Sequence, residues 1–113
     1  MILDLHSHSR KLGTFFYGNT MTDSSERNLA KILPAMVCKN DERFSFSSCR
    51  FGGGNNLAAR RVLFNKLEIP LIYTIESSFY GYQKDDFRIV PYYPKDYREM
   101  SESVLKTFAQ YMT

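Results

Sequence analysis

The stretch PLIYTI, residues 70–75, is a nearly unbroken apolar run that ends at the acidic residue Glu76. A run of this kind is typical of a strand that is buried on both faces of a parallel sheet. Because a parallel sheet needs helices to cover its faces, the stretch predicts an α/β architecture. The rest of the sequence agrees with this prediction, since strand and helix patterns alternate along it.

The positions of these elements follow from their periodicity. Residues 2–8 alternate apolar and polar side chains, as do residues 44–51, and both patterns predict strands. Residues 94–112 carry apolar side chains at helical spacing, which predicts a closing amphipathic helix. Altogether, the predicted elements are strands at 2–8, 15–18, 44–51 and 70–75, and helices at 26–38 with a kink or break at Pro34, at 57–67 and at 94–112.

The segments between these elements have different characters. Residues 19–25 are polar and turn-like, with Ser24 or Ser25 placed to cap the helix that follows. GGGNN, residues 52–56, predicts a mobile loop. Residues 79–93 are rich in aromatic side chains and follow no regular pattern, so we expect irregular structure there.

Composition limits the class of protein. A chain of 113 residues with 43% hydrophobic and 24% charged residues is typical of one globular domain. The net charge of +3 is mild, and the densest basic cluster is Arg60-Arg61, which does not indicate a nucleic-acid-binding arm. Cys38 and Cys49 make no disulfide framework and are expected to be reduced. No stretch approaches the roughly 20 apolar residues of a membrane span, and no signal peptide is expected.

Polar residues follow two of the predicted strands at their carboxyl ends. His6 ends the first strand and Glu76 ends the PLIYTI strand. Ligands of open α/β sheets gather at this edge of the sheet. A neutral imidazole is a good zinc ligand, and a carboxylate beside an apolar strand can act as a general base. The pair therefore suggests metal-assisted hydrolysis.

Both residues could also have a purely structural role. His6 could be a hydrogen-bonded structural residue, and Glu76 could belong to a buried ion pair. The glycines of residues 52–54 could hold a phosphate at a helix N-terminus, but no Lys-Ser/Thr follows them, and a flexible turn accounts for them equally well. Ser77 and Ser78 lack a downstream histidine and a GxSxG motif, which argues against a serine hydrolase.

Several stretches read together resemble the cytosolic carboxypeptidases, a branch of the M14 zinc carboxypeptidases. DLHSHSRK, residues 4–11, is similar to D-L-H-G-H-S-R-K of that branch, and YTIESSFYG, residues 73–81, is similar to Y-T-L-E-S-S-F-x-G. Four further pieces match more weakly and follow the order of the family: FFYGN, the segment from Leu29 to Phe51, AARRV and the closing helix. The resemblance runs from residue 4 to about residue 108.

The resemblance implies a catalytic role for two residues. His6 corresponds to the third zinc ligand of the family. Glu76 corresponds to the catalytic carboxylate, which activates a water molecule and then protonates the leaving amine. Asp4 is expected to bind the histidine ligand on the side away from the metal ion and so to orient it.

The resemblance also implies substrate-binding residues. Arg60 corresponds to the arginine that faces the acidic side chain of the substrate's last residue, and a fixed guanidinium pairs well with a carboxylate. Because the family's G-T-A-R-V-V has become LAARRV here, Arg61 is a second candidate for this role. His8 shares a strand face with His6 and is expected to orient the substrate or to line the site.

The implied protein is the C-terminal part of a carboxypeptidase domain, residues 1–113, in an α/β/α sandwich with a mixed, mostly parallel sheet truncated at its N-terminus. The family's other zinc ligands come from an H-x-x-E motif, which this chain lacks, so the chain alone is expected to be inactive and weakly folded. The implied substrates are C-terminal glutamates of acidic protein tails such as polyglutamylated tubulin, in the cytoplasm and at microtubules. The alternative is a non-catalytic remnant that binds a partner.

Overall fold

The computed structural model describes residues 1–20, 28–52 and 58–113, so the predicted cap at Ser24 or Ser25 and all but the first residue of the GGGNN loop lie outside the described residues. In the described residues the main sheet has four strands in the order β1-β4-β2-β3. These strands are β1 (Ile2–His8), β2 (Thr14–Gly18), β3 (Arg50–Phe51) and β4 (Ile72–Ser78). A separate two-stranded sheet consists of β5 (Gly81–Gln83) and β6 (Ile89–Pro91).

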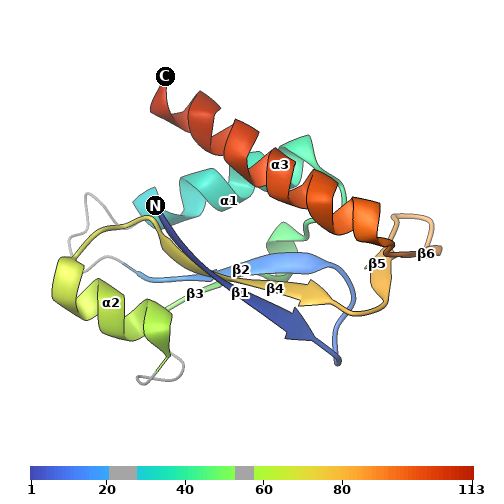
Figure 1. The fold of residues 1–113 in the computed structure, drawn as a ribbon, viewed down its shortest axis with the longest axis horizontal. Coiled ribbons are helices and arrows are strands. Elements are labelled where there is room, and N and C mark those ends of the chain that lie inside the picture. The colour runs from blue at the N-terminus through green and yellow to red at the C-terminus, as the bar shows by residue number, and fades with distance from the viewer. Residues whose placement is uncertain (21–27, 53–57) are drawn as a thin grey trace.

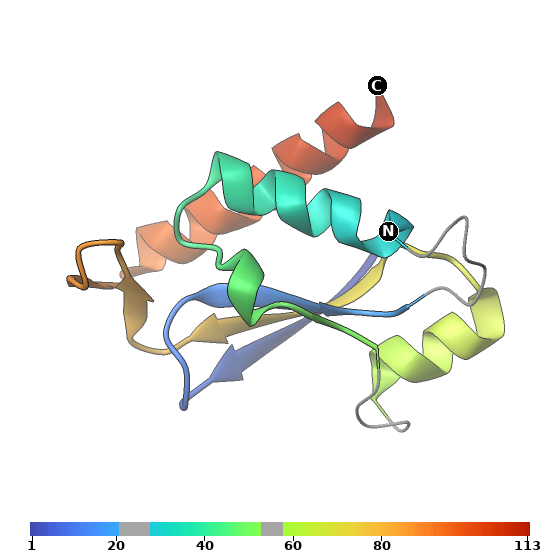
Figure 2. The same cartoon turned by 180° about the vertical axis from the view of Figure 1, so that it is seen from behind.

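Helices lie on both sides of the main sheet. They are α1 (Leu29–Asn40), α2 (Ala59–Leu67) and α3 (Pro94–Met112), with a short 3₁₀ helix η1 (Phe46–Ser48) before β3. Figure 1 shows α1 and α3 together over one face, and Figure 2 shows from behind that α2 lies on the opposite side. None of the helices that the structure describes is long and apolar enough to cross a membrane.

The sheet is mixed. β1 runs parallel to β4, and β2 runs parallel to β3, whereas β2 and β4 are antiparallel. β4 contains most of the PLIYTI stretch and lies between two other strands, and its first four residues are buried. The predicted α/β class with a mixed, mostly parallel sheet is therefore confirmed, and the apolar run is its central strand.

The core lies between the main sheet and the pair α1 and α3. Phe16 of β2 and Tyr73 of β4 pack here against Leu33 of α1, and all three are completely buried. Met100 and Val104 extend the same cluster from α3. The predicted apolar stripe of residues 94–112 is thus in part the face by which α3 covers the sheet, whereas its members Leu105 and Met112 are exposed.

The helix α1 continues through Pro34, where a kink or break was predicted. Proline has no backbone N–H, so the carbonyl of Ala30, four residues earlier, loses its helical partner. The hydroxyl of the buried Tyr73 donates a hydrogen bond of 2.7 Å to this carbonyl. The side chain from β4 therefore replaces the missing helical bond and also attaches α1 to the sheet.

Two predictions in the irregular parts of the chain are wrong. Residues 44–51 do not form one continuous strand, because the serine hydroxyls of this run bond to one another and favour the turn η1. Only an isolated bridge from Phe44 to Thr14 and the two residues of β3 pair with the sheet. Residues 79–93, expected to be irregular, contain the hairpin of β5 and β6. The aromatic residues concealed the short alternation of this hairpin.

Candidate active site

A cavity of about 620 Å³ lies on the face of the sheet opposite α1 and α3. The strands β1, β2 and β4 form its floor, and the start of α2 and the segment around β3 form its walls. Its polar lining includes Asp4, His6, Tyr17, Arg60, Thr74 and Glu76. Cationic and anionic side chains thus meet over the carboxyl ends of the parallel strands β1 and β4, where the sequence predicted a ligand site.

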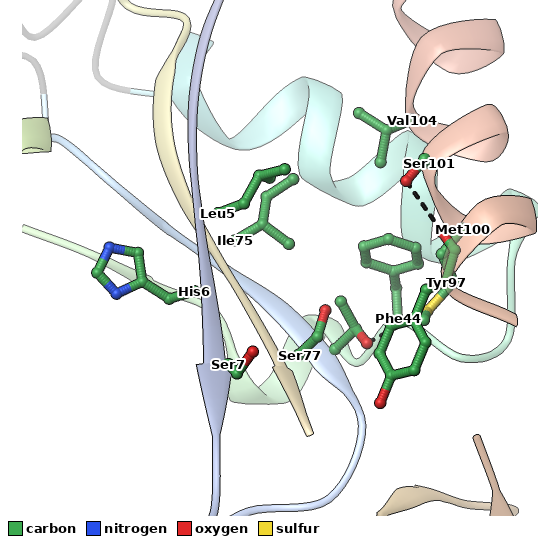
Figure 3. A pocket seen from close by; sticks show the side chains of 11 residues that line it. Leu5, His6, Ser7, Phe44, Ile75, Ser77, Tyr97, Met100, Ser101 and Val104 are labelled. Atoms are coloured by element: carbon green, nitrogen blue, oxygen red, sulfur yellow. Dashed lines mark hydrogen bonds between the residues drawn. The ribbon is translucent and has the colours of Figure 1, made fainter. Parts of the chain in front are cut away.

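His6 and Glu76 are direct register partners in the parallel pair of β1 and β4. Side chains at paired positions emerge on the same face, and neighbouring strands lie about 4.8 Å apart. Both side chains line the same cavity. Figure 3 shows His6 pointing away from the side of the sheet on which Leu5 and Ile75 face α3.

The imidazole of His6 is oriented by Asp4, which lies two residues earlier on the same strand face. The distance from His6 Nε2 to Asp4 Oδ2 is 2.9 Å. Because a carboxylate only accepts hydrogen bonds, Nε2 carries the proton in this pair, and the lone pair of Nδ1 is left for another group. A carboxylate behind a histidine is the usual support of a metal-binding imidazole.

Arg60 brings a buried positive charge to the wall of the cavity. Its side chain projects from the first turn of α2, the residue is 7% exposed, and its Nη1 donates to the carbonyl of Gly18 at 2.9 Å. Its Nε is buried without a partner among the described residues. Burial, followed by the nearby charge of Arg61, lowers the pKa of Arg60, although the side chain of Tyr17 acts in the opposite direction. An anion in the cavity would offset the free-energy cost of burying the charge of Arg60.

Asn19 accepts hydrogen bonds from both Arg60 and Arg61, and the sequence did not predict this role. The residue is completely buried, and its Oδ1 accepts from Arg61 Nη1 at 3.1 Å and from Arg60 Nη1 at 3.5 Å. Its Nδ2 lies 3.4 Å from the carbonyl of Ile72. In the sequence Asn19 stands out only as the last letter of the FFYGN match, because its partners lie far away along the chain.

The other two predicted substrate-binding residues lie outside the cavity lining. Arg61 follows Arg60 in α2 and packs its guanidinium over the ring of Phe64 at 5.9 Å. His8 accepts the backbone N–H groups of Arg10 and Lys11 at its Nδ1, both at 2.9 Å. It therefore stabilises the turn after β1. Their roles toward a substrate stay predictions.

Among the described residues, the side chain of His6 has the geometry of a single metal ligand. His6 suits one ligand position, since its Nδ1 is free to bind and its other nitrogen is held by Asp4. A catalytic zinc takes three protein ligands, and no group of three or more His, Cys, Asp or Glu side chains suited to a metal ion exists among residues 1–20, 28–52 and 58–113. The donor set in this part of the chain is therefore incomplete.

Known proteins are similar to nearly the whole chain. Cytosolic carboxypeptidase 6 of Homo sapiens is 34% identical in an alignment of 113 residues, and this alignment covers 96% of this chain and 22% of that protein. The protein of the same name from Mus musculus is also 34% identical, with 96% and 21% covered. Cytosolic carboxypeptidase 2 of Danio rerio is 38% identical over 81 residues, with 69% and 11% covered. No protein-family model matches the chain.

A mixed α/β sheet with an imidazole and a carboxylate on adjacent parallel strands is compatible with the C-terminal part of a carboxypeptidase-like fold. The similarity to the named relatives agrees with this class along almost the full length of the chain. This chain belongs to the cytosolic carboxypeptidase family. It spans about a fifth of the length of the two carboxypeptidase 6 relatives.

Proposed function

We propose that this chain is the C-terminal part of a zinc carboxypeptidase that removes glutamates from acidic protein tails, such as polyglutamylated tubulin. The observation that carries the proposal is the pairing of His6 with Glu76 at the floor of a cavity whose wall contains the buried Arg60. The names of the relatives support carboxypeptidase chemistry and a cytoplasmic location, and association with microtubules belongs to the same proposal.

Glu76 is the proposed general base and acid. Its carboxylate takes a proton from the attacking water and later gives it to the leaving amine. The position of Glu76 on the central strand β4 fixes this carboxylate relative to His6. When zinc is bound, it supplies Lewis-acid chemistry to the substrate carbonyl and to water, and His6 is one of its ligands in the proposal.

Arg60 is the proposed specificity residue. A substrate that ends in glutamate brings a carboxylate into the cavity, where the buried guanidinium lacks an anionic partner among the described residues. The uncharged amide of glutamine could not neutralise this guanidinium. The buried charge therefore supports selection for an acidic last residue.

The experiment uses the complete protein that the gene encodes. Its transcript should carry an in-frame H-x-x-E motif upstream of this chain, and its absence would instead favour a non-catalytic binding module. The complete protein should release glutamate from a polyglutamate peptide. The Glu76→Gln variant should lose this activity and keep its bound zinc, measured by metal analysis. A Gln variant with unchanged rate would show that Glu76 is not the base.

A further inference from the structure

Asn19 directly follows β2 and is completely buried, although its side chain is polar. Both ends of its amide make hydrogen bonds. The oxygen Oδ1 accepts from Arg61 and Arg60, and the nitrogen Nδ2 donates to the carbonyls of Ile72 at 3.4 Å and Arg60 at 3.5 Å. An amide buried without partners is costly, and these bonds offset that cost. They also fix the amide in one orientation between β2, α2 and the start of β4.

Three consecutive residues, Tyr17, Gly18 and Asn19, hold the guanidinium of Arg60. Its Nη1 donates to the carbonyl of Gly18 at 2.9 Å and lies 3.5 Å from Oδ1 of Asn19, and its Cζ lies 5.9 Å from the centre of the Tyr17 ring. All of these contacts are with uncharged groups, and Nε is buried without a partner among the described residues. The guanidinium is therefore positioned by its neighbours but not neutralised by them.

The neutral side chain at position 19 has an electrostatic consequence. An amide oxygen carries only a partial negative charge, whereas a carboxylate at the same distance would attract a guanidinium several times more strongly. Burial and the nearby charge of Arg61 lower the pKa of Arg60, which indicates that its positive charge is not compensated. The side chain of Arg60 lines the cavity, so this charge is available to an anion there.

We propose that Asn19 is a positioning residue for Arg60, whose neutral amide fixes the guanidinium beside the cavity and leaves its charge for an acidic group of the substrate. Asn19 lies outside the cavity lining, so it acts on the substrate only through Arg60. The inference rests on the proposed function, because that function assigns the last glutamate of the substrate to Arg60. The side chain at position 19 then sets how strongly the enzyme prefers glutamate.

The test uses the complete protein and two peptides that differ only in their last residue, glutamate or glutamine. In Asn19→Asp the new carboxylate pairs with the arginines, so the preference for glutamate, measured as the ratio of kcat/KM values, should fall roughly tenfold or more. The loss should appear as a higher KM for the glutamate peptide, with the constants of the glutamine peptide nearly unchanged. A role in folding alone would lower kcat for both peptides by the same factor, and the unchanged ratio would overturn the proposal.

Asn19→Ala separates the two parts of the proposed role, because it removes the acceptor without adding a charge. Arg60 keeps its contacts with Gly18 and Tyr17, so the preference should fall by a smaller factor than in Asn19→Asp. The ratio is measured on active molecules only, so a variant that folds in part still reports it. If Asn19→Asp gives no folded enzyme, an unchanged ratio in Asn19→Ala overturns the proposal.

The natural enzyme distinguishes the failure of this inference from that of the proposed function. If the natural enzyme does not prefer glutamate over glutamine, the proposed function is wrong and the role of Asn19 falls with it. If the natural enzyme has the preference and both variants keep it in full, only the role of Asn19 is wrong.

Discussion

Arg60 and Arg61 are neighbours in the sequence, but the structure gives them different surroundings. Both Nε atoms are buried without a partner among the described residues, but Arg60 lines the cavity, whereas Arg61 packs over Phe64 outside the lining. The Arg60→Met variant of the complete enzyme should therefore lose most of its preference for peptides ending in glutamate over glutamine. A loss of about 2 kcal/mol in transition-state binding corresponds to roughly a 30-fold change in the ratio of kcat/KM values.

The matched control is Arg61→Met, measured with the same two peptides. This variant should keep the glutamate preference, because Arg61 contacts Asn19 and Phe64 and not the cavity. The opposite result, with the preference lost only in Arg61→Met, would mean that Arg61 has taken over the role expected of Arg60.

At the scale of residues, the sequence predicted positions better than interactions. The strand-end argument placed His6 and Glu76 at one edge of the sheet, and the register of β1 and β4 does pair them. The hydrogen bonds of Asn19 to Arg61 and Ile72 could not be foreseen, since they depend on the packing of α2 against β2 and β4. Local patterns carry no information about such distant partners.

At the scale of elements, the bond from Tyr73 to the carbonyl of Ala30 allows a helix with an internal proline to stay continuous. The Tyr73→Phe variant should lower the free energy of unfolding by about 1–3 kcal/mol, because it leaves a buried carbonyl without a donor. Urea denaturation of the chain measures this change.

Pro34→Ala provides the control for this interpretation. An alanine at position 34 supplies the N–H that proline lacks, so the carbonyl of Ala30 regains a helical partner. Tyr73→Phe should therefore cost less in the Pro34→Ala background than in the natural sequence. An equal cost in both backgrounds would show that the hydroxyl of Tyr73 acts elsewhere.

A second link between elements joins the end of α1 to the start of α3. Arg43 contacts Asp41 at 2.8 Å, Asp96 at 3.0 Å and Glu99 at 2.9 Å, and the side chains of Arg43 and Asp41 are 14% and 3% exposed. Arg43→Met should lower the free energy of unfolding by about 2–4 kcal/mol, since it leaves the buried carboxylate of Asp41 without its charged partner. The exposed pair of Arg88 and Asp86 offers a control, and Arg88→Met should cost at most about 1 kcal/mol.

The same ion pairs predict that the free energy of unfolding depends on pH. Burial raises the pKa of Asp41, but the hydrogen bonds from Arg43 and Ser103 lower it more, so it lies below its ordinary value of 3.8. A lowered pKa in the folded state means that the stabilisation is complete above this ordinary value and is lost as the pH falls through the folded value. The unfolding free energy should therefore drop in this acidic range, and Arg43→Met should flatten the drop. An equally steep drop in Arg43→Met would exclude this link as the cause.

The elements themselves were predictable where one period continues over many residues. The apolar run of β4 is nearly unbroken over six residues and the stripe of α3 repeats over several turns, and the structure contains a strand and a helix at these places. Residues 44–51 alternate in the sequence, yet the serine hydroxyls bond to one another and the segment turns. Strand predictions from short serine-rich patterns fail in this way, because hydrogen bonds of the side chains favour a turn over pairing in the sheet.

At the scale of the whole molecule, one edge of the sheet is exposed. β1 pairs only with β4 among the described strands, so its other edge presents unpaired backbone groups. On the same strand Leu5 is 71% exposed, although its register partner Ile75 is 7% exposed. Leu5 borders a smaller cavity of about 220 Å³ between these strands and α3. This edge agrees with the expectation that the chain folds weakly when it is alone.

The exposed edge predicts self-association of the isolated chain, through edge-to-edge pairing and contact of the apolar Leu5 side chains. Leu5→Lys should reduce association in light scattering at high concentration and change the free energy of unfolding by less than about 0.5 kcal/mol, because the side chain is already exposed. Ile75→Lys at the paired position should unfold the chain, because it buries an unpaired charge. If Leu5→Lys unfolded the chain as Ile75→Lys does, Leu5 would have to be buried in solution, and the free edge would not exist.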